Sequence, residues 1–494
     1  MTMVALPIVI PLAAAAVSAM LVGFPLARRL LGVSTLIATT VFSVMLLASV
    51  ADGTVLVVHV GAWDWPLGIT LVVDLLAAIM VAVSSVMLAT VLIYAIGSPT
   101  TEDTATFFHP IYLILAAGVS ASFLTGDIFN LFVAFEVTLT ASYVLITFGG
   151  GRTQVRHGIT YIVISLVAST LFITAVGLIY AATGTVNMAD LSLRLADIDP
   201  NLRAGLGVLF LVVFGVKAAI FPLFFWLPDS YPAAPSPVTA IFAGLLTKVG
   251  VYAIIRTHTL LFGDPGPSTL LLTVAGLTMV IGVLGAIAQN DVKRILSFHI
   301  VSQIGYMIFG LGLYTVAGLA ATVFYVVHHI IVKTTLFLVG GLIEQRTGTS
   351  TLRRLGGLLH LSPLLAVLFL LPALSLAGVP PLSGFIAKLG LVQAGLDIGS
   401  YATVAIALGV SILTLFSMTK IWAGVFWGRR EPVAEPSVAP VRTGLPALMV
   451  APTVFLVAAS LAFVVAAAPL YALGQTAADG LIDRSVYVSA VIEQ

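Results

Sequence analysis

Long apolar runs separated by short polar stretches follow one another along the whole chain. A run of 18 or more apolar residues with few charges is long enough to cross a bilayer as a helix. Because the runs are continuous rather than short and alternating, they exclude a transmembrane β-barrel. The pattern predicts an all-α, polytopic membrane protein with about 14 transmembrane helices, at residues 3–23, 30–51, 72–96, 108–125, 128–148, 158–182, 204–227, 237–259, 267–289, 295–314, 316–343, 362–396, 401–427 and 444–470.

The composition agrees with this class and narrows the chemistry. Of 494 residues, 60% are hydrophobic and 8% are charged, whereas about a quarter of a soluble chain is charged. The chain has no Cys, which excludes disulfides, iron–sulfur clusters and thiolate metal sites. It also has no GxxxxGK[ST] phosphate loop, which makes ATP-driven transport an unfavoured interpretation. We expect no cofactor, no metal and no nucleic-acid partner.

The basic residues between the runs are distributed unequally. Loops after the first, fifth, ninth, eleventh and thirteenth runs hold 12 of them: Arg28, Arg29, Arg152, Arg156, Lys293, Arg294, Arg346, Arg353, Arg354, Arg429, Arg430 and Arg442. The loops on the opposite side hold Arg194, Arg203, Arg256 and Arg484. Because basic loops stay in the cytoplasm, we expect the larger set to be cytoplasmic and both termini to lie on the outer side.

The remaining five basic residues are lysines inside apolar runs: Lys217, Lys248, Lys333, Lys388 and Lys420. A charge at the bilayer centre costs about 2.5–3.5 kcal/mol on insertion scales. One such residue is explained by snorkelling, or by an ion pair that only locks two helices together. Lys420 lies near the cytoplasmic end of its run, so an interface role and a role in proton uptake both stay open for it. The other four indicate an ion pathway.

An acidic residue accompanies these lysines. Glu136 lies nine residues after Asp127, which is about 13 Å along a helix and close to the midplane. Lys217 and Lys248 are similarly central in their runs. A carboxylate beside a desolvated lysine changes how tightly that lysine holds its proton. Glu136 and Lys217 therefore indicate a switchable proton site, with a purely structural ion pair as the alternative.

Histidines extend this row of titratable groups. His329 and Lys333, four residues apart, share one helix face, and His328 is adjacent. Because histidine titrates near neutral pH, it can bridge between lysines. His299 lies five residues beyond Arg294, near the expected cytoplasmic rim, and is either a point of proton uptake or an interfacial residue. We expect the other histidines at the surface, namely His59, His109, His157, His258 and His360.

Two of the apolar runs contain helix breakers beside a lysine. Pro222 follows Lys217 by five residues, and Gly378, Pro380, Pro381 and Gly384 precede Lys388. Such residues predict discontinuous helices, whose freed carbonyls must face protein or water.

Spacing relates the two breaks. Lys217 and Lys248 are 31 residues apart, and Lys388 and Lys420 are 32 apart. This predicts two five-helix repeats, at 108–259 and 260–427, between N-terminal helices at 1–107 and a last helix and tail at 428–494. An odd number of spans in each repeat makes the second one inverted.

Three stretches make the chain similar to a known family. FPLFFWLPDSYPAAPSPVTAIFAGLLTKVGVYAIIR, QNDVKRILSFHIVSQIGYM and GVPPLSGFIAKLGLV resemble the antiporter-like subunits of respiratory complex I, membrane-bound hydrogenases and Mrp-type cation/proton antiporters. The resemblance covers nearly the whole chain. GDIFNLFVAFEVTLTASYVLI is most similar to D subunits of the Mrp branch.

The resemblance implies roles for individual residues. Glu136 and Lys217 match the family's glutamate–lysine pair, and Lys248 matches the lysine that bridges the two half-channels. The other matches are His329 with Lys333 for the family's relay, His328 as an extra neighbour, and Lys388 for the terminal residue of the second broken helix. Some complex I pump subunits carry Glu at that last position, so Lys388 disfavours that subtype.

Three functions stay in view. The favoured one is a subunit of a hetero-oligomeric antiporter in a bacterial or archaeal plasma membrane, which exchanges cytoplasmic Na⁺ or another monovalent cation for external protons. A row of lysines suits protons and repels cations, so we expect the cation path mostly in partner Mrp-type subunits. The second is a proton-pumping subunit of a redox complex, and the third is an inert scaffold, which has no use for five intramembrane lysines.

Overall fold

The structure, a computed structural model, describes residues 2–63, 65–98, 106–263, 266–428 and 444–493. Arg429, Arg430 and Arg442, which we expected on the cytoplasmic side, lie outside these ranges. Within them, 12 helices are long and apolar enough to cross a membrane, and α4 (Phe108–Leu124) and α16 (Pro363–Ala377) are shorter apolar helices. The all-α membrane fold is confirmed. The count of 14 spans and the division into two inverted repeats stay predictions.

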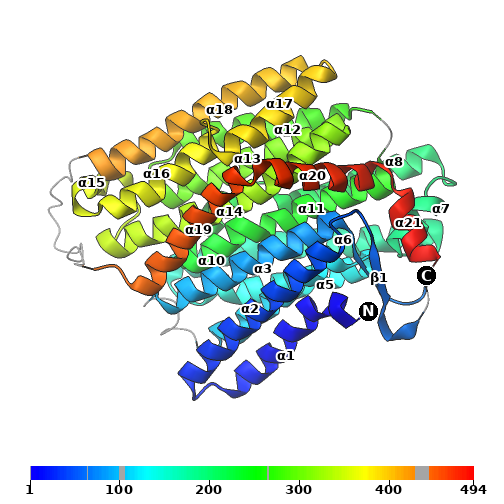
Figure 1. The fold of residues 1–494 in the computed structure, drawn as a ribbon, viewed down its shortest axis with the longest axis horizontal. Helices are drawn as coiled ribbons and strands as arrows, with labels where there is room; N and C mark the ends of the chain where they lie inside the picture. Colours follow the sequence, from blue (N-terminus) through cyan, green and yellow to red (C-terminus); the bar gives the residue numbers. More distant parts are fainter. Residues whose placement is uncertain (1, 64, 99–105, 264–265, 429–443, 494) are drawn as a thin grey trace.

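The N-terminal helices form one edge of the bundle (Figure 1). η1 (Thr2–Ala5) leads into α1 (Leu6–Met20), which packs on α4, and α2 (Pro25–Ser49) packs on α3 (Leu75–Ile96). Between α2 and α3 lies an antiparallel hairpin of β1 (Leu56–His59) and β2 (Thr70–Val73), with η2 (Val60–Ala62) after β1. The apolar runs do not predict this hairpin, because each strand has only four residues.

The elements that carry the lysines follow in two groups. The first comprises α5 (Ile128–Thr147), α6 (Arg152–Thr183), α7 (Met188–Arg194), α8 (Pro200–Ala218), α9 (Leu227–Ala233), α10 (Ser236–Ile241), η3 (Phe242–Leu246), α11 (Thr247–Thr257) and η4 (His258–Phe262). The second comprises α12 (Thr269–Ala288), α13 (Val292–Leu313), α14 (Val316–Thr347), η5 (Leu352–Arg354), α15 (Leu358–Leu361), α17 (Ser383–Asp397) after α16, α18 (Tyr401–Trp422) and η6 (Ala423–Trp427). The chain ends with α19 (Ala447–Val465), α20 (Ala467–Ile482) and α21 (Ser485–Ile492).

Two spans form the centre of the bundle. The most apolar windows of the span from α10 to η4 and of α14 are 100% buried, whereas those of α1 and α2 are 33% buried. η3 and α10 pack directly on α14, and α20 crosses in front of it (Figure 1). Lys248 on α11 and Lys333 on α14 therefore lie in the protein interior rather than against lipid.

Two helices break where the sequence predicts interruptions. α8 ends at Ala218, Ala219 is left-handed with φ +60°, and helix resumes with α9. α16 ends at Ala377, Gly378 is left-handed with φ +88°, and α17 begins at Ser383. The first break begins at Ala219 rather than at Pro222, because a proline ring clashes with the carbonyl four residues earlier, here that of Ala218, and has no N–H to donate to it.

The C-terminal tail is more helical than expected. After the predicted last span, α20 continues the chain as a helix that packs on α14 and α3. Its buried residues are spaced by three and four positions, and most of them are small: Gly474, Ala477, Ala478 and Leu481. Polar residues alternate with these positions, so the stretch is too polar to stand out as an apolar run.

Four positions contradict the expected surface and loop assignments, among them Lys293, which lies in α13 and is 5% exposed. Arg28 lies in α2, is 5% exposed and donates a hydrogen bond to the carbonyl of Thr106. Arg256 lies in α11 and is 4% exposed, and His109 in α4 is 1% exposed. A guanidinium is tolerated at a buried helix end when it is paired and hydrogen-bonded, and Arg256 is paired with Asp74.

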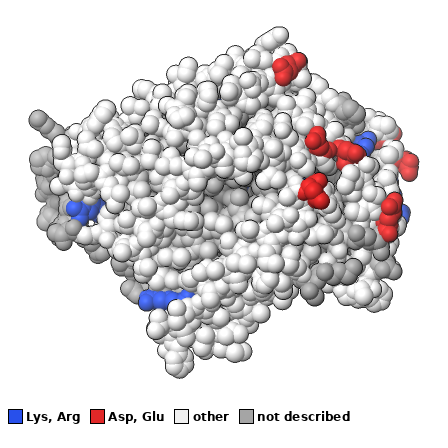
Figure 2. All heavy atoms as spheres, viewed as in Figure 1, with Lys and Arg blue, Asp and Glu red and all other residues white. Residues whose placement is uncertain are grey.

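Charged side chains avoid the middle of the surface seen in Figure 2. Figure 2 shows a broad face that is almost free of Lys, Arg, Asp and Glu, with acidic residues gathered at one end and basic residues toward the other. The acidic end is the one that carries α7, α21 and both termini (Figure 1). An uncharged belt between two charged ends is the form that a membrane-spanning bundle requires.

Candidate functional site

The π-helical turn η3 shapes the site around Lys248. A π-helix releases a backbone carbonyl from the regular α-helical ladder. The Nζ of Lys248 donates a hydrogen bond of 2.6 Å to the carbonyl of Ala243 in this turn, and one of 3.2 Å to Oγ1 of Thr247. Lys248 is 0% exposed. The turn therefore supplies a polar contact for a lysine that has no access to bulk water.

Lys333 and His329 face the same interior from α14. Both side chains are 0% exposed. Within the ranges that the structure describes, Lys333 Nζ and both ring nitrogens of His329 have no hydrogen-bond partner. Lys333 Nζ lies 6.0 Å from the centroid of the Phe337 ring. Because buried polar atoms are rarely left unpaired, these atoms mark a place for ordered water or for a mobile proton.

A close approach brings η3 against α14 beside Lys333. A Cβ added at Gly244 would collide with Oγ1 of Thr334, the residue next to Lys333. Only glycine permits this contact, so Gly244 sets the separation between the two central helices. Lys248, on one of these helices, thus lies across from the relay residues on the other.

Glu136 and Lys217 are joined through α6 rather than by a direct ion pair. Ser169 donates a short hydrogen bond to Oε1 of Glu136. Lys217, near the C-terminal end of α8, donates one of 3.3 Å to the carbonyl of Ser165. Ser165 and Ser169 are one helical turn apart and nearly buried, at 4% and 7% exposure. Among the described residues, no direct ion pair joins Glu136 and Lys217, and the role of Glu136 as the electrostatic partner of Lys217 stays a prediction.

A small cavity adjoins Lys217. Its volume is about 20 Å³, and its lining includes Lys217, Ser165, Tyr161 and Tyr231. A space of this size holds roughly one water. The hydroxyl of Tyr231 has no partner among the described groups and can bind that water. The arrangement gives Lys217 a second polar neighbour beside Ser165.

Lys388 reaches back across the break in the second discontinuous helix. Its Nζ donates hydrogen bonds of 3.1 Å to the carbonyls of Leu376 and Ala377, the last residues of α16, and one of 2.8 Å to Oγ of Ser411. It also lies 4.8 Å from the centroid of the Tyr306 ring. The C-terminal end of a helix carries partial negative charge, which favours a cation here.

His328 and His299 each contact a serine. His328 Nδ1 lies 2.9 Å from Oγ of Ser383, and His299 Nε2 lies 2.9 Å from Oγ of Ser417. Both histidines are 0% exposed. His299 lies seven residues into α13, which begins at Val292, and is covered by neighbouring helices. Its assignment to proton uptake or to an interface stays a prediction.

Lys420 stabilises the end of a neighbouring helix. Its Nζ donates hydrogen bonds of 2.9 Å to the carbonyl of Ile287 and 2.6 Å to that of Gln289, at the C-terminal end of α12. Helix ends leave carbonyls without intrahelical partners, and Lys420 satisfies two of them. This geometry favours the interface alternative for Lys420.

Two ion pairs with a buried cation are not predicted by the sequence. Arg256 contacts Asp74 at 2.6 Å and lies over the rings of Tyr252 and Tyr487, at 5.4 and 5.1 Å from their centroids. Lys293 contacts Glu344 at 2.5 Å. Both pairs join residues that are far apart in the chain, so only the packing of the helices brings the charges together.

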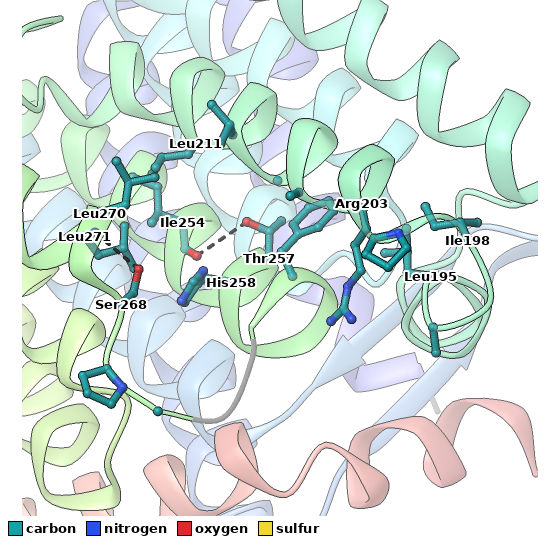
Figure 3. A pocket seen from close by; sticks show the side chains of 18 residues that line it. Leu195, Ile198, Arg203, Leu211, Ile254, Thr257, His258, Ser268, Leu270 and Leu271 are labelled. Atoms are coloured by element: carbon teal, nitrogen blue, oxygen red, sulfur yellow. Dashed lines mark hydrogen bonds between the residues drawn. The ribbon is translucent and has the colours of Figure 1, made fainter.

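A large cavity lies away from the lysines. It has a volume of about 590 Å³, between the start of α8, η4 and the start of α12. Figure 3 shows mostly apolar side chains around it, among them Leu211, Ile254 and Leu270, together with the polar side chains of Arg203 and His258. None of the candidate proton-transfer residues lines it, so cavity size does not locate the chemistry here. Nor do the described residues include any group of three or more His, Asp or Glu that could hold a metal ion.

Comparisons with known proteins match the chain along its length. The profile of the family described as "NADH:quinone oxidoreductase/Mrp antiporter, TM" matches residues 125–414. The D subunit of a Na⁺/H⁺ antiporter from Alkalihalophilus pseudofirmus is 43% identical, over 100% of this chain and 99% of that protein.

Two solved structures share the fold. One chain of the Mrp complex from Dietzia sp. superposes with a TM-score of 0.92 at 37% identity, covering 99% of both chains. One chain of an archaeal membrane-bound sulfane sulfur reductase superposes with a TM-score of 0.88 at 27% identity, again over 99% of both chains. The fold is thus similar to chains of both an antiporter complex and a respiratory complex.

Proposed function

Because the chain belongs to the NADH:quinone oxidoreductase/Mrp antiporter transmembrane family, we propose that it is the proton-translocating subunit of an Mrp-type monovalent cation/proton antiporter. The complex exports cytoplasmic Na⁺, or another monovalent cation, in exchange for external protons. The chain is part of a secondary transporter that uses the proton motive force, and it is not an enzyme. It lies in the plasma membrane with both termini on the outer side.

The observation that carries the proton role is the set of buried groups without partners on α14. Lys333 Nζ and both nitrogens of His329 lie unpaired among the described residues, in the most buried part of the bundle. A purely structural lysine would be hydrogen-bonded or ion-paired, because an unpaired buried charge is costly. Groups that gain and lose protons must be free of fixed hydrogen-bond partners.

The path follows hydrogen bonds and helix contacts through the bundle. Glu136 and Lys217 communicate through Ser169 and Ser165 on α6. Lys248, held by the carbonyl that η3 releases, passes protons to His329 and Lys333 across the contact between η3 and α14. Lys388 takes them at the break between α16 and α17.

The cation takes a different route. Most of the charged groups along this path are lysines, which repel Na⁺ in a low-dielectric interior. We therefore place the cation path in the partner subunits or at their interface with this chain. The similarity to one named subunit of a Na⁺/H⁺ antiporter supports both the cation and the need for partners.

The test is cation-dependent dissipation of ΔpH in everted vesicles from cells that lack their own Na⁺/H⁺ antiporters. The vesicles carry the whole complex, with either the wild-type chain or Glu136→Ala, and a pull-down verifies assembly. Added Na⁺ should collapse ΔpH for the wild type and not for Glu136→Ala. Thr273→Val, an exposed position on α12, is the matched control and should behave like the wild type.

A redox-coupled proton pump is the second candidate. The observation in its favour is the 0.88 TM-score to a chain of a respiratory membrane complex. An assembled wild-type complex that shows no exchange with any monovalent cation would support this candidate over the antiporter. Purification with iron–sulfur subunits would support it further.

A further inference from the structure

We propose that the hydroxyls of Ser383 and Ser375 form a bridge that carries protons between His328 and Lys388, across the break between α16 and α17. The proposal rests on the proposed function and assigns a route to its last step. It also gives a role to His328, which is otherwise only a neighbour of the relay histidine.

A continuous hydrogen-bonded line begins at His328. Its Nδ1 lies 2.9 Å from Oγ of Ser383, the first residue of α17, and that oxygen lies 3.1 Å from Oγ of Ser375 near the end of α16. His328 is 0% exposed, and each serine is 1% exposed. The three groups are thus shielded from bulk water and aligned for proton transfer.

The line ends beside Lys388. Ser375 directly precedes Leu376 and Ala377, whose carbonyls both accept hydrogen bonds from Lys388 Nζ at 3.1 Å. One water between Ser375 and Lys388 completes the connection, because ordered waters bridge polar groups nearly as well as direct bonds.

A pair of stacked tyrosines lies beside Lys388. The rings of Tyr306 and Tyr325 stack 5.4 Å apart at 14°, and Lys388 Nζ lies 4.8 Å from the centroid of the Tyr306 ring. The Tyr306 hydroxyl donates to the carbonyl of Ala407 at 2.6 Å, and the Tyr325 hydroxyl donates to Gln303. Oγ of Ser411 connects Lys388 to the Tyr306 hydroxyl, at 2.8 and 3.4 Å. In the described part of the chain, no hydrogen bond joins that hydroxyl to Tyr325 or to a histidine, so the serine line is the more direct polar route.

The backbone at the break brings the serines together. A Cβ added at Gly384 would collide with the carbonyl of Ser375 and approach Nε2 of His328 to 3.0 Å. The amide of Gly384 also donates to Oγ of Ser375 at 3.4 Å. Glycine thus allows α17 to begin against the end of α16, which places both hydroxyls in line.

The proton balance is simple. Protonated His328 gives its Nδ1 proton to Oγ of Ser383, while Ser383 gives its own proton to Oγ of Ser375. Ser375 in turn passes a proton through the water to the neutral amine of Lys388. Each hydroxyl gains one proton and loses one, so the bridge ends neutral and resets by rotation of its hydroxyls.

The experiment measures cation-dependent ΔpH dissipation by the assembled complex with Ser383→Ala, Ser375→Ala and the two Ser→Thr variants. We expect each Ala variant to slow exchange by at least about tenfold. At least one of Ser383→Thr and Ser375→Thr, which keep a hydroxyl, should exchange within about twofold of the wild-type rate. Ser302→Ala is the control, because Ser302 is equally buried but donates only to the carbonyl of Met279. Wild-type rates in both Ala variants, or slow exchange that neither threonine restores, would overturn the bridge.

A second readout does not depend on transport. Histidine labelled with ¹⁵N in the assembled complex gives a signal for His328, which Ser383→Ala should shift and Ser302→Ala should not. An unshifted signal would contradict the bridge even if the wild-type complex exchanged no cation. Failure of the proposed function would appear in wild-type vesicles, whereas failure of the bridge appears only in the variants and in this spectrum.

Discussion

Lys248 donates its shortest hydrogen bond, 2.6 Å, to the carbonyl of Ala243 five residues earlier in the same span. In a regular α-helix this carbonyl would accept from the amide four residues later. The π-helical turn η3 alters that pattern and makes the carbonyl available to the lysine. The turn therefore serves the chemistry of Lys248 as well as the packing of the bundle.

Replacement of Lys248 should stop transport without unfolding the protein. We expect Lys248→Met to lower cation-dependent ΔpH dissipation by at least about a hundredfold, because the path loses a proton carrier. Lys248→Arg should fail as well, since a guanidinium does not release its proton near neutral pH. Equal exchange by Lys248→Arg and wild type in assembled complexes would contradict a proton-carrying role.

Ser169 should tune the coupling of Glu136 to Lys217. Ser169→Ala removes the hydroxyl that donates to Glu136 Oε1 and leaves the carboxylate without this partner. We expect exchange to slow by about threefold to tenfold, which corresponds to about 0.7–1.4 kcal/mol, the net contribution of one typical hydrogen bond. Ser169→Thr keeps the hydroxyl and should remain close to wild type in the same vesicle assay. A full loss of transport by both variants would instead indicate that α6 is mispacked.

Lys420 should matter for stability and not for transport. Lys420→Met leaves the carbonyls of Ile287 and Gln289 without their donor, at a cost of about 1–3 kcal/mol for a partly buried site. We expect a lower melting temperature of the purified complex in detergent, with an unchanged exchange rate for each assembled complex. A normal melting temperature together with lost exchange would return Lys420 to the proton path.

The Asp74–Arg256 pair should show strong coupling. Asp74→Ala leaves a buried guanidinium without its carboxylate, which should cost about 3–5 kcal/mol. Arg256→Met fills similar space without a charge, so the double variant should be more stable than Asp74→Ala alone. The measurement is a double-mutant cycle: the free energy of thermal unfolding is compared for the wild type, both single variants and the double variant. Additive effects would show that the pair contributes no coupling.

Asp127, which precedes α5, should make stability depend on pH. Burial raises the pKa of its carboxyl from 3.8 to about 6, against the lowering effect of hydrogen bonds from the amides of Asn130 and Phe129. Between pH 4 and 6 the unfolded carboxyl ionises while the folded one stays protonated, so stability falls as pH rises through this window. Asparagine caps a helix as well as aspartate. Asp127→Asn should therefore raise the melting temperature at pH 8, and this gain should vanish near pH 3.5.

The measurement for Asp127 is a series of melting temperatures from pH 3.5 to 8 for both proteins. Asp483 offers a comparison, because hydrogen bonds from the hydroxyl and amide of Ser485 hold the pKa of its exposed carboxyl below the usual value. Asp483→Asn should not stabilise the protein at pH 8. A constant difference between Asp127→Asn and wild type at all pH values would contradict titration of Asp127.

The sequence predicts the membrane fold and most of the lysine row for a physical reason. A charge is so costly among apolar residues that each buried lysine stands out, and proline and glycine mark the two breaks beside Lys217 and Lys388. The π-helical turn before Lys248 leaves no such mark, because FAGLL is ordinary helical sequence and its geometry follows from packing against α14. The burial of Arg256 and His299 also depends on neighbours that are distant in the sequence.

The π-helical turn also gives part of the central span a way to rotate about the helix axis. Its extra residue can move along the helix without breaking the span, and passage of that residue beyond Lys248 would rotate the lysine by about 100°. The two ends of the span would stay in place, since Ser236 is bonded to Glu344 at 3.1 Å and Arg256 to Asp74 at 2.6 Å. Lys248 would then face different neighbours while the bundle keeps its shape, so a single travelling residue could switch the direction in which the lysine delivers its proton.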